Sequence, residues 1–176
     1  MGVAVGVLLG VAAVLIAIDQ WTKHLVVADL DPESPVRALG GLLYLDLTFN
    51  SGAAFSFGRN YTFVFPVIAI VISGVILWLA CGLRSWPWAA AMGLVLGGAV
   101  GNLIDRLFRA PGPFRGNVVD FLSVFAPDAK YFPIFNVADS ALTIGVILAI
   151  ALELFGFRRD GMRLLAQRPA DDQPGA

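Results

Sequence analysis

Long stretches without a charged residue are the feature of this sequence that most limits its fold. Met1 to Ile18, Tyr61 to Leu83 and Ser85 to Ile104 contain no Asp, Glu, Lys or Arg. A fourth apolar run, Asn136 to Phe157, contains only two charged residues. A transmembrane helix needs about 20 consecutive, mostly apolar residues. The sequence therefore predicts four transmembrane helices, at about residues 2–23, 61–83, 86–107 and 136–157.

The composition agrees with a membrane protein and excludes several other classes. Hydrophobic residues make up 58% of the chain and charged residues 14%, whereas soluble domains have about 45–50% and about 25%. The net charge of −1 gives no Lys/Arg excess, so we expect no nucleic-acid partner. His24 and Cys81 are the single histidine and cysteine, too few for a zinc or thiolate site. We expect no metal and no cofactor, and chemistry based on carboxylates, amides and hydroxyls.

Charge density predicts how the chain crosses the membrane. Five basic residues lie close together in the short link between the second and third runs and in the C-terminal segment: Arg84, Arg158, Arg159, Arg163 and Arg168. Short segments near helix ends carry most weight in the positive-inside rule. We therefore expect both termini in the cytoplasm and residues 24–60 and 108–135 outside it. Residues 1–168 are expected to form one integral-membrane domain, and the polar residues 169–176 a disordered tail.

The first long connection contains a strand pattern. In LLYLDLTFN, the apolar residues Leu43, Leu45, Leu47 and Phe49 alternate with more polar ones, which predicts a half-buried strand. Asn50-Ser51-Gly52 is a turn signal, so residues 53–57 are expected to return as a second strand. Such a pair of strands has two interpretations: it grips an extended peptide by its backbone, or it only caps the helices.

Two aspartates at the membrane boundary are the candidates for chemistry. Asp139 lies in the fourth apolar run beside Asn136, and ionisable residues inside spans mark function by default. Asp120 follows a Pro/Gly-rich stretch and is unremarkable by itself. If the two carboxyls face each other, both cannot ionise. One then serves as a general acid while the other activates water, as in aspartic proteases.

The other polar groups near the spans have structural interpretations as well. The i,i+4 spacing of Asp19 and Lys23 is more typical of an interfacial ion pair at a helix end than of a catalytic pair. Asp105 and Arg106 are adjacent, which slightly favours a buried pair that locks helices together. The glycines of GGAVGNLIDR (97–106) allow another backbone to approach closely.

Five segments resemble, in order, the motifs of the lipoprotein signal peptidases, the bacterial signal peptidase II family. They are DQWTK (19–23), FNSGAAF (49–55), GGAVGNLIDR (97–106), GNVVDF (116–121) and FNVADS (135–140). The resemblance covers all but the C-terminal tail. One departure is the stretch between Arg106 and Gly116, which is longer than the usual family spacing and leaves the conformation of loop 107–115 open.

The resemblance implies an all-α membrane protein of four transmembrane helices, with a small extracytoplasmic β-sheet cradle after the first helix. It implies an aspartic peptidase of the bacterial inner membrane, with Asp120 and Asp139 as the catalytic pair near the outer leaflet. Its implied partners are membrane lipids, globomycin-type inhibitors and diacylglyceryl-modified prolipoproteins, which are cleaved just before the modified cysteine. The resemblance also implies supporting roles, including the holding of substrate or inhibitor, at Asp19, Lys23, Asn50, Gly52, Asn102, Asp105, Arg106, Asn136 and Ala138.

Three alternative functions use the same residues. A proton-coupled transporter also keeps carboxylates in its spans, but it is expected to show inverted repeats or broken helices, and the sequence has no internal repeat. A Mg²⁺-dependent lipid-phosphate enzyme would use Asp105, Asp120 and Asp139 as oxygen ligands and would be sensitive to EDTA. A non-enzymatic assembly protein would have no need of Asp139 inside the membrane.

Overall fold

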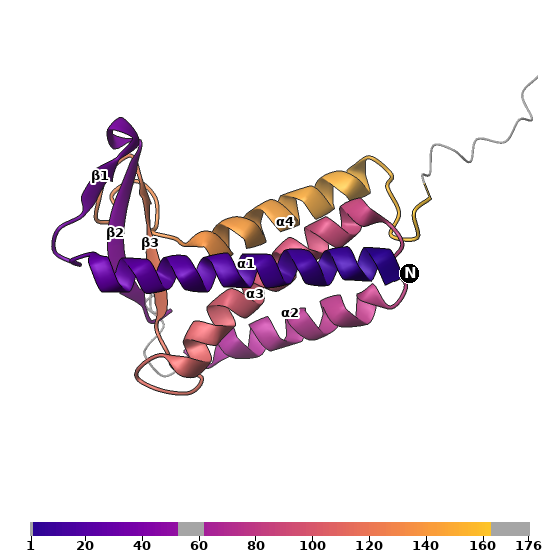
Figure 1. Ribbon diagram of the computed structural model, residues 1–176, viewed down its shortest axis with the longest axis horizontal. Coiled ribbons are helices and arrows are strands. Elements are labelled where there is room, and N and C mark those ends of the chain that lie inside the picture. The colour runs from indigo at the N-terminus through magenta and orange to yellow at the C-terminus, as the bar shows by residue number, and fades with distance from the viewer. Residues whose placement is uncertain (1, 53–61, 163–176) are drawn as a thin grey trace, which may run out of the picture.

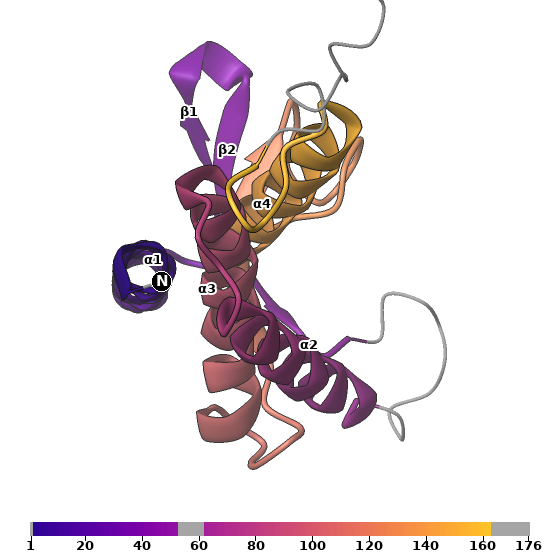
Figure 2. The ribbon, with the colours of Figure 1, turned by 90° about the vertical axis from the view of Figure 1, so that its right-hand side faces the viewer.

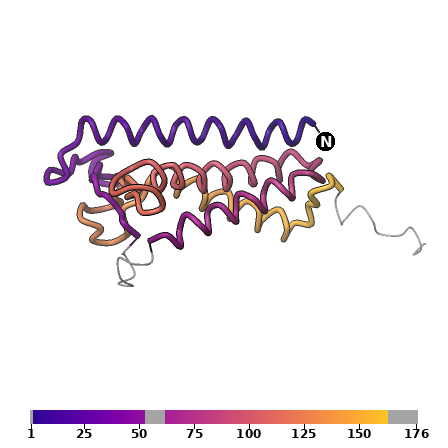
Figure 3. Tube along the Cα trace, turned by 90° about the horizontal axis from the view of Figure 1, so that it is seen from below, coloured from indigo at the N-terminus to yellow at the C-terminus, as the bar shows by residue number. Residues whose placement is uncertain are grey.

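The computed structural model describes residues 2–52 and 62–162, which form four helices and a small sheet. The helices are α1 (Gly2–Asp29), α2 (Val64–Ala80), α3 (Trp86–Phe108) and α4 (Val137–Leu154). They run side by side, and the sheet lies at one end of the bundle (Figures 1 and 3). The start of α1, the link between α2 and α3, and the end of α4 all lie at the opposite end.

Three of these helices, α1, α3 and α4, are long and apolar enough to cross a membrane. The fourth, α2, has 17 residues and is therefore only about 26 Å long at 1.5 Å per residue, against a hydrocarbon core of about 30 Å. Four apolar helices therefore lie where the apolar runs predicted them, although α2 is shorter than the expected span of 61–83.

The first helix is longer than the sequence predicted. We expected it to end at Lys23, but α1 continues to Asp29. Its last turns pack on the sheet, where Val26 joins a buried cluster with Leu47, Val119 and Phe121. Burial of this apolar contact stabilises the additional turns.

Helix α3 is the centre of the bundle, with α1, α2 and α4 packed around it (Figure 2). Its glycines make this arrangement possible, as predicted for the GGAVGNLIDR segment. A Cβ on Gly97 would lie 2.7 Å from Leu15 Cδ2 of α1, and one on Gly101 would lie 2.8 Å from Asp19 Oδ2. On another side of α3, a Cβ on Gly98 would collide with the Ala138 carbonyl oxygen of α4.

The sheet has three antiparallel strands in the order β1 (Val36–Ala38), β2 (Leu43–Asn50) and β3 (Val118–Val124). The predicted strand at residues 43–50 is confirmed as β2. The expected return strand at 53–57 lies outside the described residues. Strand β3, which follows α3 in the chain, pairs with β2 and sets Thr48 opposite Asp120. The sheet is therefore not formed only by the segment after the first helix.

Candidate active site

Asp120 and Asp139, which we call the aspartate pair, line one cavity of about 220 Å³ where the sheet meets the helices. Asp120 lies on β3 and is 2% exposed. Asp139 lies in the first turn of α4 and is half-buried. The cavity wall is completed by polar side chains, including Asn50 and Asn102, and by apolar ones, including Phe65.

Asn136 orients both aspartates from the start of α4. Its Oδ1 accepts a hydrogen bond from Asp139 N at 2.9 Å, and Asp139 Oδ2 accepts one from Asn136 N at 3.2 Å. This reciprocal capping box stabilises the start of the helix. The Asn136 Nδ2 group also donates to Asp120 Oδ1 at 2.7 Å. The residue that begins α4 thus joins the strand aspartate to the helix aspartate.

Two further amides complete the contacts of the pair. Asn50 Nδ2 donates to Asp120 Oδ2 at 2.9 Å, and Asn102 Nδ2 donates to Asp139 Oδ1 at 2.7 Å. Each of the four carboxylate oxygens therefore accepts a hydrogen bond from an N–H group. Within residues 2–52 and 62–162, neither aspartate forms a salt bridge.

The environment of Asp120 favours its protonated form. The pKa of Asp120 is raised from 3.8 to about 6: burial is the largest cause and the charge of Asp139 adds to it, while hydrogen bonds from Asn50 and Asn136 lower the pKa. A carboxyl group with this pKa still holds a proton in weakly acidic solution, as a general acid must.

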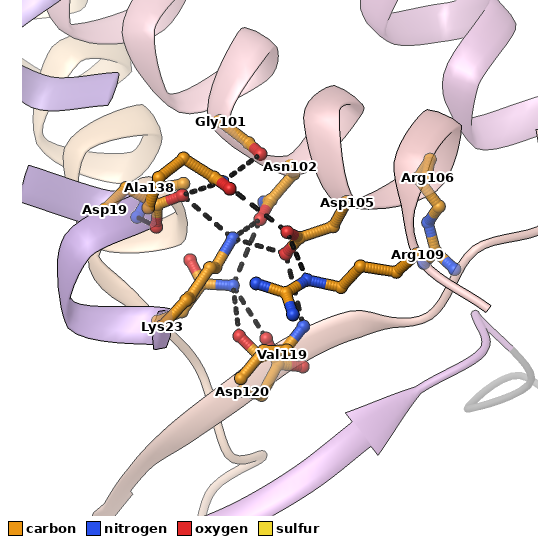
Figure 4. Close-up of polar contacts among 12 residues, drawn as sticks. Asp19, Lys23, Gly101, Asn102, Asp105, Arg106, Arg109, Val119, Asp120 and Ala138 are labelled. Atoms are coloured by element: carbon orange, nitrogen blue, oxygen red, sulfur yellow. Dashed lines mark hydrogen bonds and ion pairs between the residues drawn. The ribbon is translucent and has the colours of Figure 1, made fainter. Parts of the chain in front are cut away.

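A second group of charges lies beside Asp120 (Figure 4). We call Asp19, Lys23, Asp105 and Arg109 the ion-pair cluster. Lys23 Nζ lies 2.9 Å from Asp19 Oδ2 and 2.8 Å from Asp105 Oδ2, and Arg109 Nε lies 2.7 Å from Asp105 Oδ1. The side chains of Asp19, Lys23 and Asp105 have no exposed surface.

Two expectations about these charges are wrong. Asp19 and Lys23 do pair, but they are buried between helices rather than placed at an exposed helix end, because α1 continues past Lys23. Asp105 pairs with Lys23 and Arg109, and not with Arg106. Figure 4 shows the Arg109 side chain reaching Asp105 while the Arg106 side chain turns away from it.

Arg106 instead joins the end of β2 to the loop before β3, beside the cavity. Its Nη1 donates to the backbone carbonyl oxygens of Asn50, at 3.1 Å, and Gly116, at 3.0 Å. Its guanidinium also lies 5.5 Å from the centre of the Phe65 ring. Gly52 follows β2 with a φ of +81°, and a Cβ there would lie 2.7 Å from the Phe65 ring. A side chain at this position would therefore be strained and would press on the cavity wall.

Ala138 connects the ion-pair cluster to α4. It is fully buried, and its backbone N–H donates to Asp19 Oδ1 at 3.0 Å. The structure thus brings all of the predicted site residues together where α1, α3, α4 and the sheet meet.

Two contributors to this region were missed by the sequence analysis. Gln20 donates to the Gly101 carbonyl oxygen at 3.0 Å and to Asp19 Oδ2 at 3.1 Å. Arg109 is the second partner of Asp105, and its i,i+4 spacing from Asp105 was a usable signal. No comparable spacing identified Gln20, because its partners include a backbone carbonyl of another helix.

Loop 107–115, whose conformation the sequence left open, is closed by backbone hydrogen bonds. Gly116 N donates to the Arg106 carbonyl oxygen at 3.1 Å, and Asn117 N donates to that of Ala110 at 3.0 Å.

A second cavity of about 290 Å³ includes Thr48, Pro133 and Ile134 in its lining and shares Asn50 and Asp120 with the first. The two cavities therefore meet at these two residues.

Comparisons with known proteins agree with this arrangement. A family model described as signal peptidase (SPase) II matches residues 11–155. The chain is 46% identical over 170 residues to the lipoprotein signal peptidase of Mycolicibacterium smegmatis, covering 96% of this chain and 69% of that one. It is 48% identical over 157 residues to the lipoprotein signal peptidase of Streptomyces coelicolor, covering 89% and 74%.

A solved structure of similar fold is a bacterial membrane enzyme determined by the in meso method at 1.9 Å resolution. It aligns with a TM-score of 0.73 and 31% sequence identity, over 85% of this chain and 93% of that one. The match to the family model, the identity to these relatives and the likeness of fold lead to one conclusion: the chain belongs to the signal peptidase II family.

Proposed function

We propose that this protein removes signal peptides from prolipoproteins by hydrolysing the bond before the diacylglyceryl-modified cysteine. It does so in the bacterial inner membrane, as a multi-pass aspartic-type peptidase. The observation that carries the proposal is the aspartate pair in a chain of this family. Its two carboxyl groups line one cavity and accept hydrogen bonds from amides. Within the described residues, neither forms a salt bridge. Asp120 and Asp139 are the catalytic residues.

The chemistry needs one protonated and one ionised carboxyl group. Two neighbouring carboxylates repel each other, so the pair retains one proton over a range of pH. The ionised member takes a proton from water as the water oxygen attacks the scissile carbonyl carbon. The protonated member supplies a proton to the carbonyl oxygen. The C–N bond then breaks, and the cysteine nitrogen leaves with a proton.

The two cavities that meet at Asn50 and Asp120 fit an extended peptide that passes the aspartate pair. The first has an apolar wall made of Phe65 and Pro66 of α2 and Leu103 of α3, which suits the lipid-modified side of the substrate. Asn50, Asn102 and Arg106 supply polar groups for the peptide backbone or for a globomycin-type inhibitor. In this role the sheet does more than cap the helices.

The finer topology is also part of the proposal. Both termini lie in the cytoplasm, and the aspartate pair lies near the outer leaflet, where the diacylglyceryl chains hold the scissile bond. A reporter fused after Arg168 is expected to read as cytoplasmic, and one inserted at Pro111-Gly112 as extracytoplasmic. Two reporters on the same side of the membrane would contradict the proposed topology.

The decisive experiment uses the full-length protein in liposomes with a lipidated prolipoprotein. Cleavage is followed by the change in electrophoretic mobility and by mass spectrometry of the new N-terminal cysteine. We expect cleavage that globomycin blocks, and no cleavage of a matched prolipoprotein whose cysteine is replaced by serine. Equal cleavage of the two substrates would contradict the proposed specificity.

The same assay tests the Mg²⁺-dependent alternative. Two cations already neutralise Asp105, so it is a poor third ligand for a metal with Asp120 and Asp139. We expect full activity in EDTA. Loss of cleavage in EDTA, restored by added Mg²⁺, would favour the metal-dependent mechanism over the aspartic one.

A further inference from the structure

Lys23 has a third contact besides its two carboxylates. Its Nζ donates to Asn102 Oδ1 at 3.0 Å. An ammonium group has three N–H donors, and here each has a partner: Asp19, Asp105 and Asn102. Because the Lys23 side chain has no exposed surface, its ammonium group cannot exchange these contacts for hydrogen bonds to solvent. The ammonium group is therefore held in one orientation.

This contact fixes the orientation of the Asn102 amide. Its Oδ1 accepts hydrogen bonds from both Lys23 Nζ and Asn136 Nδ2, each at 3.0 Å. A flipped amide would point its NH₂ group at two other donors. With the oxygen held toward Lys23, Nδ2 faces Asp139 Oδ1 at 2.7 Å. The ammonium also polarises the amide and strengthens this hydrogen bond.

The two aspartates differ in the charges and dipoles that act on them and on the amides that donate to them. Asp139 lies in the first turn of α4, where the helix dipole favours a negative charge. The Asn102 amide connects it to the ammonium group of Lys23. Asp120 lies on a strand. The amides that reach Asp120 have oxygens that accept only backbone N–H groups within the described residues: Gly52 N for Asn50 and Asp139 N for Asn136.

We propose that Lys23 is a positioning residue: through Asn102 it holds Asp139 as the ionised, water-activating member of the pair and leaves the proton on Asp120. The inference rests on the proposed function. Asp139 takes a proton from water as Asp120 gives its proton to the carbonyl oxygen. When the C–N bond breaks, the proton on Asp139 passes to the cysteine nitrogen, and a hydroxyl proton of the intermediate returns to Asp120.

Several charged groups surround Asp139. Among the cations in the described residues, Lys23 is the one connected to it through a single intervening side chain, that of Asn102. The charged groups are Asp19 and Lys23 of α1, Asp105 and Arg106 of α3, and Asp120 of β3. Arg106 donates to backbone carbonyl oxygens, and Arg109 reaches Asp105 rather than Asn102. Lys23 is therefore the cation whose removal should change the ionisation of Asp139 most.

The test is the pH dependence of kcat/KM for Lys23→Met in the full-length protein, with lipidated prolipoprotein in liposomes. Without the ammonium, Asp139 ionises less readily. The acidic limb of the profile is expected to move up by about one pH unit, and kcat/KM on that limb to fall about tenfold. Asn102→Ala should give the same shift, and the double variant should shift no further, because both changes interrupt one connection.

Arg109→Met is the matched control, because it removes the other cation on Asp105 and leaves Asn102 untouched. Its acidic limb should stay at the wild-type pH even if its stability falls. If Lys23→Met does not fold, Asn102→Ala decides the question alone. An unmoved acidic limb in an active Lys23→Met or Asn102→Ala protein would overturn the positioning role. Cleavage by Asp120→Asn or Asp139→Asn would instead overturn the proposed function.

Discussion

The ion-pair cluster and the aspartate pair lie side by side, and both are built from aspartates in an apolar part of the chain. Asp19 and Asp105 each contact a cation at 2.9 Å or less. Asp120 and Asp139 are held by amide and backbone N–H groups and open onto a cavity. Carboxyl groups of the same type are thus paired with cations in one group and held only by uncharged donors in the other.

This difference indicates what each group does. When a carboxylate is paired with a buried cation, removing either partner leaves an uncompensated charge. A carboxylate held only by neutral donors can exchange a proton with a substrate or with water in the cavity. We therefore expect Asp19, Asp105 and Arg109 of the ion-pair cluster to determine stability and the aspartate pair to determine the rate of the reaction, with Lys23 connecting the two groups through Asn102.

The most direct test of this difference is to replace each member of the aspartate pair with an uncharged residue of the same shape. Asp120→Asn and Asp139→Asn are each expected to lower kcat by at least about 10²–10⁴-fold, while the melting temperature in detergent changes little. The double variant should be hardly slower than either single variant, because the two residues act as a unit. The measurements are cleavage of lipidated prolipoprotein and thermal unfolding.

The matched control is Glu153→Gln, an exposed carboxylate near the end of α4, which should retain full activity. Appreciable cleavage by either single variant, with contaminating wild-type enzyme excluded, would remove that aspartate from the reaction.

Removing a charge from the ion-pair cluster should have the opposite signature. Asp105→Asn leaves Lys23 and Arg109 short of a negative partner, so it is expected to lower the free energy of unfolding by roughly 3–5 kcal/mol. Activity should fall with the folded fraction. Adding Arg109→Gln restores charge balance and should recover part of the stability. A stable but inactive Asp105→Asn protein would give Asp105 a chemical role and erase the distinction between the two groups.

A smaller effect is expected from crowding the junction between the two groups. In Gly101→Ala the new Cβ would lie 2.8 Å from Asp19 Oδ2 and 3.2 Å from Ala138 Cβ. We expect a loss of about 1–3 kcal/mol in unfolding free energy, as Asp19 is pushed from its partners. Gly74→Ala on α2 is the control, because a Cβ there meets nothing within 4 Å. Equal melting temperatures for the two variants would show that this junction is not tightly packed.

The apolar runs predicted the helices well, because a membrane helix is encoded in one continuous segment. Their ends depended on partners that are distant in the sequence. The extra turns of α1 follow from the contact of Val26 with the sheet, and no local signal announces that contact. Strand β3 was not predicted because its pairing with β2 joins residues about 70 positions apart, as between Thr48 and Asp120.

The site was predicted as a set of residues but not as a set of contacts. The family motifs gave the residues, including the two aspartates. The expected pair of Asp105 and Arg106 is wrong because neighbouring residues on a helix do not face each other, whereas residues four apart do. Asp105 and Arg109 obey that rule. The contact between Lys23 and Asn102 joins two helices, and only their packing through glycines brings it about.

The smallest expected effect concerns the proton on Asp120. Because the pKa of Asp120 is raised to about 6, the proton is lost as the pH rises through that value, and both members of the pair are then ionised. kcat/KM, which reports the free enzyme, should fall about fivefold between pH 6 and pH 7. Stability should change in the same direction: a carboxyl group whose pKa in the folded state exceeds its ordinary value of 3.8 stabilises the fold fully below about pH 4 and loses that contribution as the pH rises through about 6. In Asp120→Asn this dependence of the melting temperature should disappear, whereas in Glu153→Gln it should remain. A wild-type kcat/KM that is flat or rising from pH 6 to 7 would show that the proton does not reside on Asp120.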